Sequence, residues 1–585
     1  MMSKMRFTAE ELRRRHLSTR ITAADRAYEF ANDFYADGGV LFCKVCQHSV
    51  DYLRKQTILE HLKSQRHSNR KRSGLVRSRT QTLAACLSKT PSTAERKEFV
   101  LDFTKALVEA DIPLEKAPKL ACFLQKYCKQ GGSLPAPSHL RSDYLPELFP
   151  QYVEDIKSAV EGKPIYIVLD ETTDACGRCV LAILLQPVGR PPLAADIVFI
   201  DRVNFNTVSQ AVISCLNSFS INFSDVWAFV TDSASYMKKA FNTMLHGLFP
   251  NSIHVTCLAH LLNLVLQVFP DTFEDLNRVC ALVKRVFCKA PQRRQDLRAY
   301  MQALDLAPVM PVFAVMTRWG SWIEAVQYLA DNLDILCNFI PTLPLSSKAV
   351  RDLRVLLEEK EATLKAHAIF IVEHSTEIKT TMTKLQETSN PSAATTHGQL
   401  ENLLMLFEYG RTVGAEDWHP RTTERLRELD EDDRAACTEL FQKTMADCST
   451  KLQNVMASHP SMELFKALPV FDPAKVAGVR KNIQDYVQVA PALTCVSAEE
   501  WHRYIHMDKS DADEVSPVEW WATREDRMPT LAPLAALYLH LPTTSVDVER
   551  LFSHYTMLLT QYRRSLTQNN IKMMLIAKFN SRQQD

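Results

Sequence analysis

No run of apolar side chains in this 585-residue sequence approaches the ~18 residues that a membrane-spanning helix needs, so we do not expect a membrane protein. The first residues, MMSKMRFTAEELRRRH, lack the apolar core of a signal peptide, so we do not expect secretion. The 15 cysteines are scattered over the chain, which is typical of reduced intracellular thiols rather than of a disulfide framework. Apolar residues make up 46% and charged residues 23%, which excludes global disorder and fibrous architectures.

The net charge of +1 conceals an uneven distribution of charged residues. Residues 1–80 hold 17 Lys and Arg against 8 Asp and Glu, whereas the remaining residues hold 52 against 60. Lysine and arginine neutralise phosphates and release condensed counterions, so a basic head on a mildly acidic body is typical of nucleic-acid contact. Taken alone, this charge fits a solvated tail equally well.

The basic head contains cysteines and histidines at the spacing of metal ligands. Two residues separate Cys43 from Cys46, fourteen separate Cys46 from His61, and five separate His61 from His67. Two thiolates and two imidazoles complete a tetrahedral shell, so the spacing predicts a structural Zn²⁺ site of the Cys2His2 type. A short hairpin around the cysteines and a helix with apolar residues at 58–62 fit this prediction. A chance occurrence of these four residues is the alternative.

The predicted finger helix carries a dense set of basic side chains that can contact DNA. They are Arg54, Lys55, Lys63, Arg66 and Arg70, followed by Lys71 and Arg72. The stretch NRKRSGLVRSR (69–79) fits a nuclear localisation signal, or a solvated linker. The segment LFCKVCQHSVDYLRKQTILEHLKSQRHSNRK resembles the BED-like fingers of the CGG triplet repeat-binding family, which implies double-stranded DNA as the ligand.

From residue 163 the pattern changes to short, apolar, β-rich runs. IYIVLD, CVLAILLQPV and PLAADIVFIDRV come in succession, and VWAFVTD and SIHVTCLAH follow, each of these two running into a helical pattern. Three consecutive strands followed by strand–helix alternation predict a mixed sheet with helices on its faces. This is the order of an RNase H-like α/β core.

Helical periodicity dominates the rest of the chain, apart from interior loops that we expect at 388–398 and 427–433. We therefore predict five regions. They are a basic region with a BED-like finger at about 38–72 (1–80), a helical DNA-binding or dimerisation domain (81–160), the first part of the RNase H-like domain (161–288), an all-α insertion domain (289–528), and the last part of the RNase H-like domain with C-terminal dimerisation helices (529–585).

Two carboxylates follow strongly apolar strands. Asp170 ends IYIVLD and Asp232 ends WAFVTD, and strand ends are where side chains converge on a ligand in sheets of this kind. Neighbouring carboxylates repel each other, and divalent cations such as Mg²⁺ or Mn²⁺ relieve that repulsion. Asp232 fits a cap of the following helix equally well. A third ligand is Glu549, which we expect to be buried and to need a partner, either Arg550 or a metal ion.

Over almost its whole length, the chain is similar to hAT-superfamily DNA transposases. The matching stretches are IVLDETTDACGRCVLAILLQPVG, FVTDSASYMKKAF, HVTCLAHLLNLVLQ, TRWGSW and LPTTSVDVERLFS with RRSLTQNNIKMMLIAKFN. The resemblance implies a catalytic, magnesium-binding triad of Asp170, Asp232 and Glu549. It also implies the Cys-x2-His pair of Cys257 and His260. One departure is Thr172, which stands where several branches of the superfamily have tryptophan.

The resemblance also implies residues that contact DNA. His260 is expected to contact the scissile phosphate or a neighbouring nucleotide, whereas Cys257 packs in the core; a zinc site made by these two residues is the alternative. The Arg-Trp pair of the insertion domain corresponds to Arg318 and Trp319. Trp319 can stack on an extruded base or pack in a core, and Arg318 can hold a phosphate or a carboxylate. The pair Cys176-x2-Cys179 is interpreted as incidental.

The function that this resemblance implies is transposition. A transposase of this type binds terminal inverted repeats, cuts and joins DNA by two-metal phosphodiester chemistry, and leaves hairpins on the flanking DNA. The alternative is a domesticated, CGG-repeat-like regulator that binds DNA without catalysis. We expect a nuclear protein that contacts transposon ends and target DNA and acts as a homodimer or a larger oligomer, with Zn²⁺ in the finger and Mg²⁺ or Mn²⁺ at the catalytic site.

Overall fold

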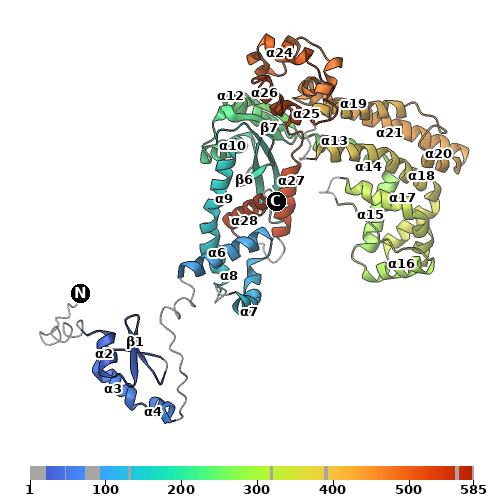
Figure 1. The fold of residues 1–585 in the computed structure, drawn as a ribbon. Coiled ribbons are helices and arrows are strands. Elements are labelled where there is room, and N and C mark those ends of the chain that lie inside the picture. Colours follow the sequence, from blue (N-terminus) through green and yellow to red (C-terminus); the bar gives the residue numbers. More distant parts are fainter. Residues whose placement is uncertain are drawn as a thin grey trace. The chain divides into compact units, whose positions relative to one another are not determined.

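The computed structural model describes residues 21–46, 48–72, 93–128, 134–315, 320–387, 393–559 and 566–582 (Figure 1). The chain forms two compact units, one within residues 1–107 and 113–144, the other of residues 108–112 and 145–585. Among the described helices, none has both the length and the apolar character that crossing a membrane requires.

The finger is a small three-stranded sheet packed against helices. Strand β2 (Val40–Cys43) pairs antiparallel with β1 (Phe34–Asp37) and with β3 (Ser49–Val50), and the strands are preceded by α2 (Ala23–Glu29) and followed by α3 (Lys55–Lys63) and α4 (Gln65–Arg72). Gly38 and Gly39 have φ of 57° and 78°, the left-handed conformation that closes the β1–β2 hairpin. Phe34, Leu41 and Ile58 form the buried core. The predicted hairpin around the cysteines is present as β2–β3, whereas β1 and α2 lie before the predicted start near residue 38.

Helices occupy the described part of residues 93–160, as predicted. They are α6 (Thr93–Glu109), α7 (Ala117–Tyr127), α8 (Pro137–His139), a single π-type turn (Leu140–Tyr144) and α9 (Leu145–Val160). Residues 81–92 lie outside the described residues. In α9, Tyr152, Ile156 and Val160 recur every four residues and are buried, so this face packs on the sheet that follows.

The second unit is built on a five-stranded mixed sheet. Its strands are β4 (Ile165–Thr173), β5 (Cys179–Pro187), β6 (Leu193–Ile200), β7 (Val226–Thr231) and β8 (Ile253–Thr256), in the order β6-β5-β4-β7-β8. Strands β4, β5 and β6 pair antiparallel, and β7 and β8 run parallel to β4. All five predicted strands and the mixed sheet are confirmed. Side chains on both faces of β4 and β5 are buried, as expected for a sheet covered by helices on both sides.

Helices join the parallel strands and continue beyond β8. They are α10 (Phe205–Ser218), α11 (Ser235–Ala240), a π-type turn (Phe241–Leu245), α12 (His246–Leu248), α13 (Leu258–Leu266), α14 (Val268–Thr272) and α15 (Glu274–Phe287). The described residues of 289–528 contain no strand, as predicted for the insertion. Its helices are α16 (Pro291–Ala303), α17 (Ser321–Phe339), α18 (Lys348–Leu385), α19 (Ala393–Gly410), α20 (Pro420–Arg427), α21 (Glu431–Ser458), α22 (Met462–Ala467), α23 (Gln484–Val487), α24 (Ala498–His506) and α25 (Pro517–Ala522), with short 3-10 turns between several of them.

The insertion has its own aromatic core. Phe370 of α18 stacks on Phe441 of α21 with ring centroids 3.9 Å apart, and Trp418 meets Phe370 edge-on. Both predicted interior loops are too long. Helix α19 already begins at Ala393, and only three residues separate α20 from α21, because Asp430 caps α21 by accepting a hydrogen bond from the backbone N–H of Asp433.

The last residues return to the sheet. After α26 (Leu531–Leu539), helix α27 (Val546–Leu558) packs on β4 and β5, and α28 (Gln568–Ser581) packs on β6. Figure 1 shows both red helices beside the strands of the sheet, although more than 300 residues separate them along the chain. The side-chain amide of Asn580 accepts a hydrogen bond from Ala194 N at 2.8 Å and donates one to Ala194 O at 3.1 Å, so α28 completes the edge of β6. The domain boundaries themselves stay predictions.

Candidate active site and metal centre

The four predicted finger ligands meet in one place. One ligand atom from each of Cys43, Cys46, His61 and His67 lies within 4.8 Å of the others. His67 Nδ1 lies 3.4 Å from the Sγ atoms of both Cys43 and Cys46. Zinc–sulfur bonds of ~2.3 Å and zinc–nitrogen bonds of ~2.0 Å at a tetrahedral angle imply a separation of about 3.5 Å. The donor set therefore fits a tetrahedral metal ion.

Two further observations support this fit. His61 Nε2 is buried and has no hydrogen-bond partner among the described residues, which is costly unless it ligates something. Burial lowers the pKa of His61, with the neighbouring His48 and His67 adding to the effect, and thereby favours the neutral imidazole that a metal requires.

The basic side chains of the finger divide into two groups. Lys55 pairs with Glu29, and Arg70 donates to Cys46 O at 2.8 Å, so both help to hold the finger together. Arg54, Lys63 and Arg66 are exposed, and among the described residues they have no salt bridge or hydrogen bond. Lys71 pairs with Asp33, so among the basic side chains of the predicted set that the structure describes, these three remain available for a phosphate.

Asp170 lies in β4 and Asp232 directly follows the adjacent strand β7. The predicted strand end at Asp170 was wrong, because β4 continues to Thr173 and Asp170 pairs with Ala182 of β5. Strand β4 pairs in parallel with β7, and Val168 lies opposite Val230. Asp170 and Asp232 each come two residues later, so the register brings both to the same edge. Asp232 Oδ1 accepts a hydrogen bond from Ala234 N at 3.2 Å within the turn before α11. The alternative in which Asp232 caps the following helix was wrong, because α11 begins only at Ser235, with Ala234 at its N-cap and no side-chain capping bond.

The segment before α27 brings Glu549 to this edge. Leu258 N donates to Thr543 O at 3.0 Å, and Ser545 N lies 3.2 Å from Cys257 Sγ. Ser545 Oγ donates to Asp170 Oδ2 at 3.3 Å. The start of α27 is therefore joined to both β4 and the beginning of α13, with Glu549 in its first turn. Cys257 is fully buried, in agreement with its predicted packing role.

His260 stands between the carboxylates. Its Nε2 atom lies 3.7 Å from Asp170 Oδ2 and 3.5 Å from Glu549 Oε1. Asp170, His260 and Glu549 offer ligand atoms within 4.8 Å of one another, and this group does not include Asp232. The composition of the cluster thus differs from the predicted triad, because an imidazole joins two of its carboxylates.

The electrostatics of this cluster favour a bound cation. Burial, together with the charges of Asp232 and Glu549, raises the pKa of Asp170 to about 7 against the opposing effect of His260. Burial also raises the pKa of Asp232. Burial opposes protonation of His260, but hydrogen bonding with Cys257 and Glu549 outweighs it and raises the pKa to about 11. Crowded, buried carboxylates are a suitable donor set for Mg²⁺ or Mn²⁺, and a divalent cation bound there would take over the charge compensation that His260 supplies in its absence.

The expected burial and possible partner of Glu549 were wrong. Its side chain is 39% exposed, and Arg550 pairs with the buried Asp547 at 2.6 Å instead. Val548, Leu551 and Phe552 carry the packing of α27, so the carboxylate of Glu549 is directed to the rim of the cluster. Sequence reasoning missed Ser545, whose position directly before the helix is the usual signal of an N-cap residue.

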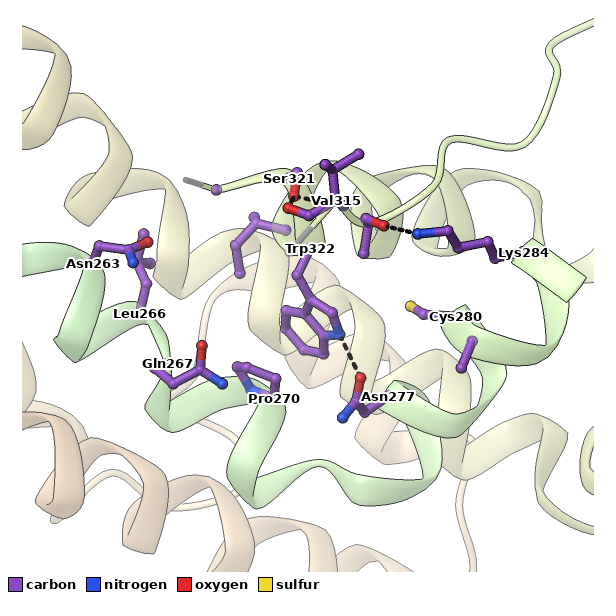
Figure 2. Close-up of a pocket in the computed structure, with 14 residues that line it drawn as sticks. Asn263, Leu266, Gln267, Pro270, Asn277, Cys280, Lys284, Val315, Ser321 and Trp322 are labelled. Carbon is purple, nitrogen blue, oxygen red and sulfur yellow. Dashed lines mark hydrogen bonds between the residues drawn. The ribbon is translucent and has the colours of Figure 1, made fainter. Parts of the chain in front are cut away.

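Arg318 and Trp319 lie outside the described residues. Among the described residues, a pocket of about 240 Å³ lies between α13, α15 and the start of α17. Figure 2 shows the indole of Trp322 in this pocket, where its Nε1 atom donates to Asn277 Oδ1 at 3.1 Å. Asn263, which also lines it, is one helical turn beyond His260 on α13.

Comparison with known proteins finds similarity in the N-terminal and C-terminal parts of the chain. The CGGBP1 N-terminal domain matches residues 17–73, the CGGBP1 helical domain matches 90–147, and the hAT family C-terminal dimerisation region matches 499–581. CGG triplet repeat-binding protein 1 of Mus musculus is 40% identical over 133 residues, which are 22% of this chain and 80% of the relative. The Homo sapiens protein is 39% identical over the same shares. The finger lies in the first match and Glu549 in the third.

Proposed function

We propose that this chain, which belongs to the CGG triplet repeat-binding protein family through its N-terminal part and carries the hAT dimerisation region, is a DNA transposase of the hAT type. Its finger binds double-stranded DNA, and its acidic cluster cuts and joins DNA. The observation that carries the catalytic part is the convergence of Asp170, His260 and Glu549, with Asp232 on the neighbouring strand. The sheet order fits the RNase H-like class that we infer for the core.

The residues of the cluster divide the work. Asp170 and Glu549 would hold one divalent cation, and Asp232 is the carboxylate that we assign to a second. Mg²⁺ or Mn²⁺ bound there supplies activation of an attacking hydroxyl and stabilisation of the leaving oxygen. His260, held 3.7 Å from Asp170 and 3.5 Å from Glu549, can donate a hydrogen bond to a phosphate oxygen that enters the cluster.

Recognition of DNA is assigned to the finger and to the insertion. Arg54, Lys63 and Arg66 would contact phosphates while bound Zn²⁺ holds the finger helices in place. Arg318 and Trp319 would contact the flanking DNA during hairpin formation. Trp322, three residues further along the chain, lines a pocket that also contains Asn263, one helical turn after His260. The dimerisation region supports a homodimer or larger assembly with at least two catalytic sites. A nuclear location follows from DNA as the substrate.

The decisive experiment compares wild type with Asp170→Asn. With Mn²⁺ and DNA that carries the inverted repeats flanking this reading frame, wild type should release ends. Asp170→Asn should lower that release by about 10³-fold, because it removes a cation ligand, while DNA binding stays unchanged. Glu147→Gln, a carboxylate on α9, is the matched control and should cut like wild type. Equal release by wild type and Asp170→Asn would refute the catalytic assignment.

A second function has an observation in its favour. Both relatives are repeat-binding proteins by name, and this chain matches 80% of their length. The match covers about the N-terminal fifth of this chain. A domesticated regulator that binds CGG-like repeats, with the remaining domains used for assembly, is therefore the alternative. It predicts tight binding to such repeats and no release of ends in any metal ion.

A further inference from the structure

The positioning of Glu549 presents a physical problem. The residue reaches Asp170 from a helix more than 370 residues further along the chain, and its own side chain is too exposed for packing to fix it. A shift of α27 by one residue would rotate Glu549 by about 100° and move it by about 1.5 Å. Apolar packing is non-directional, so it does not by itself select one register of the helix.

A second contact between α27 and β4 lies beyond the catalytic cluster. The turn after β4 places Asp174 so that Oδ1 accepts hydrogen bonds from Cys176 N at 2.8 Å and Arg178 N at 2.9 Å. Its Oδ2 accepts from Arg178 Nε at 2.6 Å and from the hydroxyl of Tyr555 at 2.7 Å. Four donors thus surround a carboxylate whose side chain is only 2% exposed. Gly177, with φ of 77°, provides the left-handed residue that this turn requires.

The carboxylate of this contact is ionised at neutral pH. Burial opposes ionisation, but the hydrogen bonds from Tyr555, Arg178 and Cys176 lower the pKa of Asp174 to about 2. Hydrogen bonds to an ionised acceptor are about twice as strong as neutral ones and are directional. The guanidinium of Arg178 is held in turn over the ring of Phe199 at 5.4 Å, so the acceptor for Tyr555 is itself fixed.

We propose that Tyr555 is a positioning residue, which docks on Asp174 and Arg178 and thereby sets the register of α27 that brings Glu549 to Asp170 and His260. Tyr555 lies six residues after Glu549, or about 9 Å along the helix, and Ser545 lies four residues before it. The helix is therefore fixed to β4 on both sides of the catalytic glutamate, by Ser545 on Asp170 and by Tyr555 on Asp174. The expected effect of Tyr555 on DNA cutting rests on the proposed function, in which Glu549 is a catalytic residue.

The test uses the zinc-loaded full chain with Tyr555→Phe, which keeps the ring and removes only the hydroxyl. Tyr486→Phe is the matched control, because its hydroxyl also donates one hydrogen bond, to Arg480 O at 2.8 Å, far along the chain from the cluster. We measure Mn²⁺ affinity by electron paramagnetic resonance, release of DNA ends against Mn²⁺ concentration, and hydrogen exchange of α27 without divalent metal.

Tyr555→Phe should weaken Mn²⁺ binding about tenfold, the range of outer-shell changes at metal sites, and excess Mn²⁺ should restore cutting. The first turn of α27 should exchange faster, while the melting temperature changes no more than in Tyr486→Phe. Wild-type affinity and exchange in Tyr555→Phe, or equal losses in both variants, would overturn the inference. Faster exchange in Tyr555→Phe, in a protein whose wild type cuts no DNA, would support the docking role and refute the proposed catalysis.

Discussion

The two candidate metal sites of this protein are built in opposite ways. The finger gathers Cys43, Cys46, His61 and His67 from 25 consecutive residues, whereas the acidic cluster gathers Asp170, His260 and Glu549 from 380. We expect the first to form only with a bound metal ion, because so small a core needs a further stabilising cross-link. The second is held by a large fold before any cation arrives. We therefore propose a structural role for a metal ion at the finger and a catalytic role for one at the sheet.

Removal of zinc should give the largest effect, because it should unfold the finger and leave the sheet with the acidic cluster folded. Zinc contributes about 10 kcal/mol or more to such fingers, so Cys43→Ser should lose zinc and unfold residues 34–72. DNA affinity should fall by at least 100-fold. The sheet should keep its structure, because Asn580 and Ala194 hold α28 on β6 without metal. Zinc content and hydrogen exchange of both regions check this, and retained zinc in Cys43→Ser would exclude the finger.

Acid should also destabilise the large fold, through buried histidines and independently of any metal ion. Burial lowers the pKa of His367 to about 4 and of His374 to about 3, below the unfolded value of 6.5. The stability contributed by these neutral histidines is complete above pH 6.5 and is lost as the pH falls toward 4. Each should cost up to about 1.4 kcal/mol per pH unit in that window.

His374→Phe checks this prediction. His374 has no hydrogen-bond partner on either ring nitrogen among the described residues, and it packs against Phe370 and Trp418, so phenylalanine keeps the ring contacts. Urea unfolding of the insertion, followed by tryptophan fluorescence from pH 7 to pH 5, should show a smaller loss of stability in the variant. An unchanged pH slope would contradict the assignment.

The same contrast explains how far the sequence could be interpreted. The finger ligands were predicted from spacing, because all four lie within a stretch whose hairpin and helix are local. The five strands and the two aspartates were predicted because each acid directly follows an apolar run. The resemblance alone, rather than residue spacing, placed His260 at the catalytic site. The place of Glu549 at the rim and the pairing of Arg550 with Asp547 were not predicted. They depend on how α27 docks on β4, and residue spacing carries no information on that register.

The smallest expected effect is a change in DNA affinity that shows which finger side chains face the phosphates. Arg66 is exposed and has no ion pair among the described residues, whereas Lys71 is held by Asp33 at 2.7 Å. Arg66→Ala should therefore weaken DNA binding a few-fold for every sequence and lower the slope of log affinity against log salt by about one. Lys71→Ala, which removes the same charge, should leave that slope nearer to the wild-type value. Equal slopes in the two variants would mean that net charge, rather than the geometry of α4, governs the contact.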